Sequence, residues 1–455
     1  MRISPEIDRV SRPNNNDTAA APARVCIETY GCAYNQSDSE VMAGLLERGG
    51  CEIVDSAADA DAVIVNSCTV KDRTYRELLK RLRALSAPPA DGDRSPVVIL
   101  AGCAPRILGQ SRELARFAQL GPDALGAIVE VVESAIAGKR VTRLERAGES
   151  RLSLPHRRRN PAIEIVPISK GCLGACAFCQ TVIARGRLHS HPLEQILDTI
   201  RLAVDEGARM IWLTAQDCGA WGMDTRTCLP RLLESVTALP GDFLVRLGMA
   251  NPDHVKLFLD DVACALAHPR FFRFAHIPVQ SGSDDVLRAM GRRHTADDFL
   301  RIVQALRQRA GDITIATDII TGFPGETDED FERTLDLLRE TEPPIINRSR
   351  FSPRPGTRAA RLEPVHSQLA AERSLRAARL HHEIIAADSR GWTGWQGAAI
   401  TENILKQDTA LTRNQSYKPI VVQRGLRPGQ KIAVRITGAE GFHLLGEVLD
   451  QAMPS

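Results

Sequence analysis

The chain has 455 residues, 43% of them hydrophobic and 25% charged, and a formal net charge of +2. This length predicts about three domains, each able to bury its own core. No run of about 18 apolar residues occurs, so we expect no membrane span. Residues 1–23 lack the apolar region of a secretory signal and are typical of a disordered tail, which favours a cytoplasmic location. The small net charge also excludes nucleic-acid binding by bulk charge, so such binding would need local basic patches.

The first predicted domain, residues 24–140, alternates apolar strands with helical patterns. Strands are expected at 24–30, 61–67 and 96–102, followed by helices at 37–49, 71–85 and 106–120. This alternation predicts an α/β domain with a parallel sheet and right-handed crossovers.

Each of these strands leads into a loop that carries one cysteine, namely Cys32, Cys68 and Cys103. The carboxyl ends of parallel strands share one edge of the sheet, which is the usual ligand edge of α/β folds. The pattern therefore predicts a site of three thiolates with one coordination position open. The alternative is that these are ordinary loop cysteines, and Cys26 and Cys51 are more simply explained as buried apolar residues.

A second group of three cysteines lies on one loop, at residues 169–180. Cys172, Cys176 and Cys179 are spaced as C-x3-C-x2-C beside Gly171 and Gly174. Four cysteines normally hold a [4Fe–4S] cluster, so three would leave one iron free for a small molecule. A zinc site or simple packing is the alternative, and the three-cysteine spacing favours iron–sulfur.

The middle domain, residues 161–388, is predicted as an open, partial (βα)6 barrel that ends in a long helix at 366–388. The expected strands are 162–169, 209–214, 243–249, 271–279, 312–320 and 344–351. The last domain, residues 389–455, has short strands bounded by glycines and predicts a small all-β barrel of the oligonucleotide-binding kind. Basic residues are concentrated in the linker at 141–160 and in the last domain, and both are candidate RNA contacts.

The segments YGCAYNQSDSE, NSCTV and AGCAPR, followed by the C-x3-C-x2-C loop, resemble the radical S-adenosylmethionine (SAM) methylthiotransferases. The segments RNQSYKPIVV, HPRFFRFAHIPVQSGS and IATDIITGFPGETDEDF are similar to the archaeal and eukaryotic-type members, which act on N6-threonylcarbamoyladenosine at position 37 of tRNA. The last domain resembles the TRAM RNA-binding module. The resemblance covers nearly all of residues 24–450.

This resemblance implies two [4Fe–4S] clusters, one on each group of three cysteines, and SAM in two roles. One SAM would methylate sulfur held at the first cluster, and the other would bind the open iron of the second cluster and be cleaved reductively. The resulting radical would abstract hydrogen from C2 of the adenine. No side chain is expected to act as a general acid or base. The implied partners are tRNA, an electron donor and a sulfur source.

The resemblance also indicates residues for SAM and RNA. Gln216 and Asp217 are candidates for the SAM amino group, and Arg246 and Gln280 for SAM or the target base. Gly322 would let the backbone approach the adenine and ribose. The candidate RNA contacts are Arg413, Tyr417, Lys418, Lys431 and Arg435, with Tyr417 as a stacking surface unless it packs inside the barrel.

Other functions fit the same cysteine pattern. The target could be isopentenyladenosine in tRNA or an aspartate of a ribosomal protein. A non-enzymatic RNA-binding protein with zinc sites is the alternative from another class. Neither the tRNA isoacceptors nor the oligomeric state follow from the sequence.

Overall fold

The computed structural model describes residues 21–68, 72–87, 95–145 and 150–449. The first domain contains a six-stranded, all-parallel sheet in the order β2-β1-β3-β4-β5-β6. The three expected strands are confirmed and occupy the centre of this sheet. The strands are β1 (Arg24–Tyr30), β2 (Glu52–Val54), β3 (Ala62–Ser67), β4 (Val97–Gly102), β5 (Ala118–Leu120) and β6 (Thr142–Arg143).

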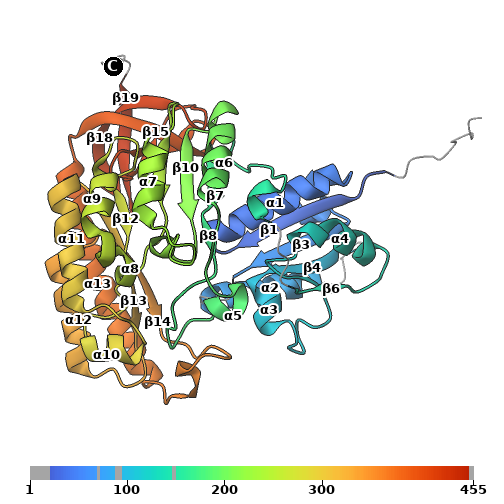
Figure 1. Ribbon diagram of the computed structural model, residues 1–455, viewed down its shortest axis with the longest axis horizontal. Helices are drawn as coiled ribbons and strands as arrows, with labels where there is room; N and C mark the ends of the chain where they lie inside the picture. The colour runs from blue at the N-terminus through green and yellow to red at the C-terminus, as the bar shows by residue number, and fades with distance from the viewer. Residues whose placement is uncertain (1–20, 69–71, 88–94, 146–149, 450–455) are drawn as a thin grey trace, which may run out of the picture.

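Helices cover both faces of this sheet, because successive strand residues point to opposite sides. On β3, Ile64 packs with helices α1 (Ala33–Arg48) and α4 (Ile128–Ile136), whereas Val63 and Val65 pack with α2 (Asp72–Leu85) and α3 (Cys103–Leu108). The central strands are thus buried on both faces, and their carboxyl ends face the middle domain (Figure 1).

The helix expected at 106–120 is wrong beyond residue 108. Helix α3 ends at Leu108, and the chain returns to the sheet as β5. Gly109 ends the helix in a tight corner where an added Cβ would lie 2.2 Å from both the Pro105 carbonyl oxygen and Gln119 Oε1. The buried Gln119 amide holds this turn by donating to the carbonyls of Gly109 and Leu114. A side chain in the following strand therefore decides where the helix stops.

The middle domain has the six expected parallel strands, arranged as two three-stranded sheets, β11-β10-β7 and β12-β13-β14. A single parallel bridge between Val245 and Phe271 joins them, so the barrel is partial. Its strands are β7 (Ile163–Pro167), β10 (Met210–Thr214), β11 (Leu244–Leu247), β12 (Phe274–His276), β13 (Thr314–Thr321) and β14 (Ile345–Arg350). A short hairpin of β8 (Ser169–Lys170) and β9 (His189–Ser190) brackets the second cysteine loop.

Helices line the outer side of these strands (Figure 1). Helix α11 was not predicted, and the helix expected at 366–388 continues to Trp392. Among the described residues, no helix combines the length and apolar character that crossing a membrane requires. The helices are α5 (Thr181–Arg185), α6 (Leu193–Asp205), α7 (Leu229–Thr237), α8 (Pro252–Val255), α9 (Leu259–Ala267), α10 (Asp284–Ala289), α11 (Ala296–Ala310), α12 (Asp328–Thr341) and α13 (Ser367–Trp392).

The last domain is the expected small β-barrel, closed in the order β15-β16-β17-β19-β18. Its strands are β15 (Gln396–Lys406), β16 (Thr409–Asn414), β17 (Pro419–Val422), β18 (Lys431–Glu440) and β19 (His443–Leu449). The boundary expected at residue 389 therefore falls inside α13. The barrel packs on the amino ends of the middle-domain strands, where Thr314 Oγ1 donates to the Ser416 carbonyl. It lies at the end opposite to α5 and the cysteine loop (Figure 1).

Candidate functional site

The first three cysteines lie together at the carboxyl edge of the first sheet, as the sequence predicts. Cys32 caps α1, Cys68 directly follows β3, and Cys103 begins α3. The Cys68 thiol hydrogen-bonds to Cys103, and this bond, with the positive charge of Arg185, lowers the pKa of Cys103 to about 6 despite burial. Burial raises the pKa of Cys32, which interacts electrostatically with Cys103. This arrangement suits a soft metal centre.

A layer of buried amides fixes the floor below these cysteines. Asn66, on β3, donates to the Asn35 carbonyl at 2.8 Å and to Ser39 Oγ at 2.9 Å. Gly102 has φ +85°, and a Cβ there would lie 2.2 Å from Asn66 Oδ1. Only glycine therefore lets β4 end this close to the amide layer and place Cys103 beside the other two cysteines.

Arg185 joins the first cysteine group to the middle domain, and the sequence analysis missed it. It lies on α5, just after the second cysteine loop, and its side chain is 4% exposed. Nε donates to Cys103 Sγ at 3.2 Å, and Nη2 donates to Asp38 Oδ2 at 2.6 Å. Its guanidinium also lies over the Tyr34 ring at 4.5 Å. The RGR sequence after the cysteines carried no spacing that would have marked this contact.

The second cysteine loop depends on two glycines. At Gly171, with φ +73°, a Cβ would lie 2.1 Å from the Arg187 carbonyl oxygen. At Gly174, a Cβ would lie 3.2 Å from Cys172 Sγ and 3.6 Å from Cys176 Sγ, so the missing side chain leaves room between two sulfurs. Burial, and then the charge of Asp217, raises the pKa of Cys172 to about 12. A cation at this loop would lower that pKa, as metal binding to a thiolate requires.

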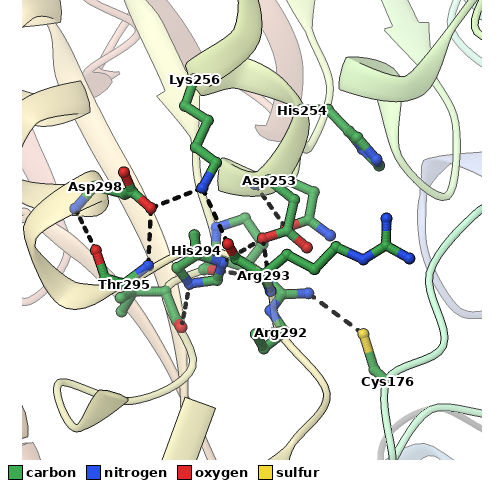
Figure 2. A network of polar contacts seen from close by, with 12 residues as sticks. Cys176, Asp253, His254, Lys256, Arg292, Arg293, His294, Thr295 and Asp298 are labelled. Atoms are coloured by element: carbon green, nitrogen blue, oxygen red, sulfur yellow. Dashed lines mark hydrogen bonds and ion pairs between the residues drawn. The ribbon is translucent and has the colours of Figure 1, made fainter. Parts of the chain in front are cut away.

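Arg292 is a second residue that the sequence analysis missed (Figure 2). Nη1 donates to Cys176 Sγ at 3.5 Å and Nη2 to the Pro278 carbonyl at 2.8 Å, while the buried Nε has no partner. The turn that carries it is fixed by Asp253, which accepts from His294 Nδ1 at 2.8 Å and from the Arg293 backbone at 3.1 Å. A guanidinium with an unused donor therefore lies beside the cysteine loop.

The two candidates for the SAM amino group have different roles in the structure. Gln216 Oε1 accepts from the Gly171 backbone at 2.7 Å, so it orders the cysteine loop. Asp217 is 1% exposed, and its carboxylate accepts from the backbones of Gly219 and Asn251 and pairs with His254 Nδ1 at 2.7 Å. Oδ1 thus holds the η4 turn (Cys218–Ala220) and Oδ2 is paired with His254, so contact of Asp217 with SAM stays a prediction.

Arg246 and Gly322 also differ from expectation. The Arg246 guanidinium lies over the rings of Trp212, Phe274 and Tyr417, at 5.0–5.3 Å, near the amino end of the barrel, where the last domain packs. Its guanidinium is therefore engaged by the aromatic cluster between the middle and last domains. At Gly322 an added Cβ would lie 2.6 Å from the Ala370 Cβ, so this glycine allows close packing of α13 rather than approach to a nucleoside.

Gln280 fits its predicted place better. It is a non-glycine residue with φ +74°, held by backbone bonds with Asp318 and Ile320. Strained backbone of this kind is often found at functional sites. Gln280 lines a cavity of about 140 Å³ together with Cys179, Asp318, Asn347 and Arg350. This cavity is at the carboxyl ends of β13 and β14, next to the second cysteine loop.

All cysteines of the described residues are free thiols. Within that part of the chain, no three His, Cys, Asp or Glu side chains are arranged around a single metal ion. A mononuclear zinc site needs such an arrangement, so the zinc alternative finds no preformed site there. In a [4Fe–4S] cluster each cysteine binds a different iron, which allows wider spacing. The thiol donors and the gap left by Gly174 fit a cluster.

Of the five candidate RNA contacts, Tyr417 and Lys418 are buried and the Arg413 side chain is 16% exposed. Tyr417 is 6% exposed and packs at 4.9 Å from the rings of Phe272 and Phe274, so the predicted stacking surface is wrong. Arg413 makes a two-pronged pair with Glu402. Lys418 is 5% exposed and pairs with Asp388 at 2.7 Å. Each cation is thus already paired with a carboxylate.

The other two candidates lie on the surface of β18. Lys431 is half exposed and pairs with Asp242 at 2.5 Å, and Arg435 is exposed beside Glu447 on β19. The basic linker is mostly neutralised within the protein. Its arginines pair with carboxylates of both flanking domains, through Arg143–Glu130, Arg151–Asp38, Arg157–Glu47 and Arg158–Glu164.

Comparison with known proteins gives two family matches. The radical SAM superfamily model matches residues 166–338, and the uncharacterized protein family UPF0004 matches residues 24–119. A probable threonylcarbamoyladenosine tRNA methylthiotransferase of Pyrococcus horikoshii is 37% identical, covering 94% of this chain and 99% of the relative. The human threonylcarbamoyladenosine tRNA methylthiotransferase is 38% identical, covering 90% and 71%. The radical SAM methyltransferase TsrM of Kitasatospora setae shares the fold, with a TM-score of 0.52 at 17% identity over 74% of each chain.

Proposed function

Because this chain belongs to the threonylcarbamoyladenosine tRNA methylthiotransferase family, we propose that it attaches a methylthio group to C2 of N6-threonylcarbamoyladenosine at position 37 of tRNA. The observation that carries this proposal is the meeting of two cysteine groups across one domain boundary. Arg185 connects them, since it donates to Cys103 and is followed by Gly186, whose carbonyl accepts from the Cys172 backbone at 3.2 Å.

The cysteines would hold two [4Fe–4S] clusters, on Cys32, Cys68 and Cys103 and on Cys172, Cys176 and Cys179. When bound, these clusters and SAM supply the one-electron chemistry and the transferred sulfur, because the C2–H bond is inert to acid–base catalysis. The protein's contribution is to position the clusters, SAM and the target base. Gln216 and the glycines shape the second cysteine loop, and the Arg292 guanidinium, beside Cys176, would pair with the carboxylate of SAM.

The target base would enter at the carboxyl ends of the middle-domain strands. The cavity beside Gln280 lies there, and its polar side chains would contact part of the nucleoside. An anticodon loop suits this geometry because its bases are unpaired and need no flipping from a duplex. No general acid or base is required by the proposal.

RNA contact by the last domain would use its surface instead of the buried residues. Arg435 is exposed, and Phe442, at the tip of the β18–β19 hairpin, is 61% exposed. The Phe442 ring lies 5.8 Å from the rings of both His381 and His382 on α13. An exposed aromatic ring of this kind is a typical stacking platform for single-stranded RNA.

The test is anaerobic reconstitution of the protein with iron and sulfide, followed by reaction with dithionite, SAM and tRNA that carries threonylcarbamoyladenosine. Mass spectrometry of the nucleosides should show the methylthio product. Cys68→Ala should abolish the product and leave SAM cleavage measurable. Product formed instead on isopentenyladenosine tRNA would overturn the substrate, and a colourless protein that binds RNA without cleaving SAM would overturn the enzyme.

A further inference from the structure

A cavity of about 720 Å³, lined by both apolar and charged residues, lies at the boundary between the first and middle domains, and the proposed chemistry does not use it. This volume is within the range of small-molecule sites. Tyr34, two residues after Cys32, lines it on one side, and Lys170, two residues before Cys172, lines it on the other. The cavity is therefore next to both cysteine loops. Its described lining also includes Asp123, Glu145, Arg151, Arg185, His189 and His191.

Positive charge is in excess around this cavity. Asp38 is shared by Arg151 and Arg185, and Asp123 is shared by Arg106 and Lys170. Four cations thus meet two carboxylates, and the most exposed of these side chains, Lys170, is only 25% exposed. Glu145 does not restore the balance, because it is 61% exposed and lies 4.0 Å from Arg143. Poorly solvated charge is costly unless an anion pairs with it.

The two excess charges have different neighbours. Arg185 is directed to Cys103, so its charge matches an anionic centre on the first cysteine group. Lys170 faces the cavity, and its Nζ bonds to Asp123 Oδ1 at 3.2 Å. An ammonium group has three donors, so Lys170 can hold a second anion while it keeps Asp123.

His191 provides an independent sign of a ligand. It is 4% exposed, lines the cavity, and its Nε2 has no hydrogen-bond partner. Burial lowers the pKa of His191 to about 3, so the ring is neutral and can donate or accept one hydrogen bond. A buried polar atom without a partner costs stability, so this part of the cavity wall is incompletely satisfied within the protein.

We propose that this cavity binds the carboxylate of the threonylcarbamoyl group, with Lys170 as its cationic partner and His191 as a polar contact. This inference rests on the proposed function and identifies how the substrate would be recognised. The isopentenyl group has no charge, so it would leave Lys170 without an anion. Discrimination between the two modified adenosines would then follow from one ion pair inside the protein rather than from contacts with the tRNA body.

The test compares binding of anticodon stem–loops that carry threonylcarbamoyladenosine, its methyl ester, or plain adenosine at the target position. Anisotropy is measured with reconstituted protein, as wild type, Lys170→Met and Lys170→Gln. A charge-assisted contact of this kind predicts that wild type prefers the carboxylate over its ester by roughly 10- to 100-fold. Both variants should lose that preference and keep their affinity for plain adenosine. Lys80→Met, an exposed lysine on α2, is the matched control.

The comparison of the carboxylate with its methyl ester uses wild-type protein alone, so it remains informative even if a substitution disturbs folding. A variant that keeps the full preference for the carboxylate overturns the subsite, although the methylthiotransferase activity would stand. Equal weakening of all three loops also overturns it, since Lys170 would then contact a tRNA phosphate. If wild type itself binds all three loops equally but methylthiolates the modified one, the subsite is wrong and the proposed function survives. Absence of both preference and product overturns both.

Discussion

Replacing Arg185 with Gln should make the first cluster harder to reduce. In the structure this guanidinium is the cation that donates to Cys103, at 3.2 Å and with 4% side-chain exposure. Hydrogen bonds and net charge near the sulfurs set the potential of iron–sulfur clusters. If the lost contact favours the reduced cluster by about 1.4 kcal/mol, the one-electron potential falls by on the order of 60 mV.

The same change should cost modest stability. Asp38 keeps its pair with Arg151 at 2.5 Å, so no carboxylate is left unpaired and the loss should stay near 3 kcal/mol, the lower end for breaking a buried pair. The assay is a redox titration followed by electron paramagnetic resonance, in a Cys172→Ala background that silences the second cluster. Arg187→Gln, an exposed arginine two residues away, is the control. An unchanged potential in a variant that retains its iron would refute the electrostatic role and leave Arg185 as a structural residue.

Three further outcomes follow from the geometry. Gly174→Ala should reduce bound iron from about eight to about four per chain, because the new methyl group would occupy the space between Cys172 Sγ and Cys176 Sγ; iron analysis checks this. Burial raises the pKa of Glu40 from 4.5 to about 7, so its contribution to stability is present below pH 4.5 and lost as the pH rises through 7. In Glu40→Gln, the free energy of unfolding measured with urea should therefore change less between these pH values. The difference from wild type should be at most about 3 kcal/mol. Phe442→Ala should weaken tRNA binding roughly 5- to 100-fold without lowering the melting temperature, and an unchanged affinity would contradict the stacking platform.

The sequence predicted the order of elements and the two cysteine groups, because both depend on local patterns. Alternation of strands and helices places strand ends on one edge, and that rule alone brought Cys32, Cys68 and Cys103 together. The C-x3-C-x2-C loop could be recognised without any fold prediction, since its three cysteines lie within eight residues. The strand at 118–120 was missed because a long-range amide, Gln119, ends the preceding helix.

The side chains that serve the site were harder to predict. Arg185 and Arg292 act on cysteines 82 and 116 residues away, and no local pattern marks either of them. Asp217 shows the opposite case. It stands in the expected loop, but one of its oxygens already bonds to the backbone of that loop and the other pairs with His254 on α8. The sequence therefore predicted which loops form the site. Whether a polar side chain in such a loop can bind a ligand depends on its neighbours in space.

Tyr417 shows how the last domain must be tested. Its ring closes the amino end of the middle-domain barrel, against Phe272 and Phe274 and below Arg246. Tyr417→Ala should destabilise the protein by about 3–5 kcal/mol, as for other buried aromatic side chains. Deleting residues 396–449 would expose the same aromatic floor, so a loss of tRNA binding in that truncated protein would report misfolding as readily as a missing RNA contact. Surface variants such as Arg435→Gln avoid this ambiguity. They should weaken tRNA binding with a shallower salt dependence at unchanged melting temperature, and an unaltered salt slope would place the RNA on another face.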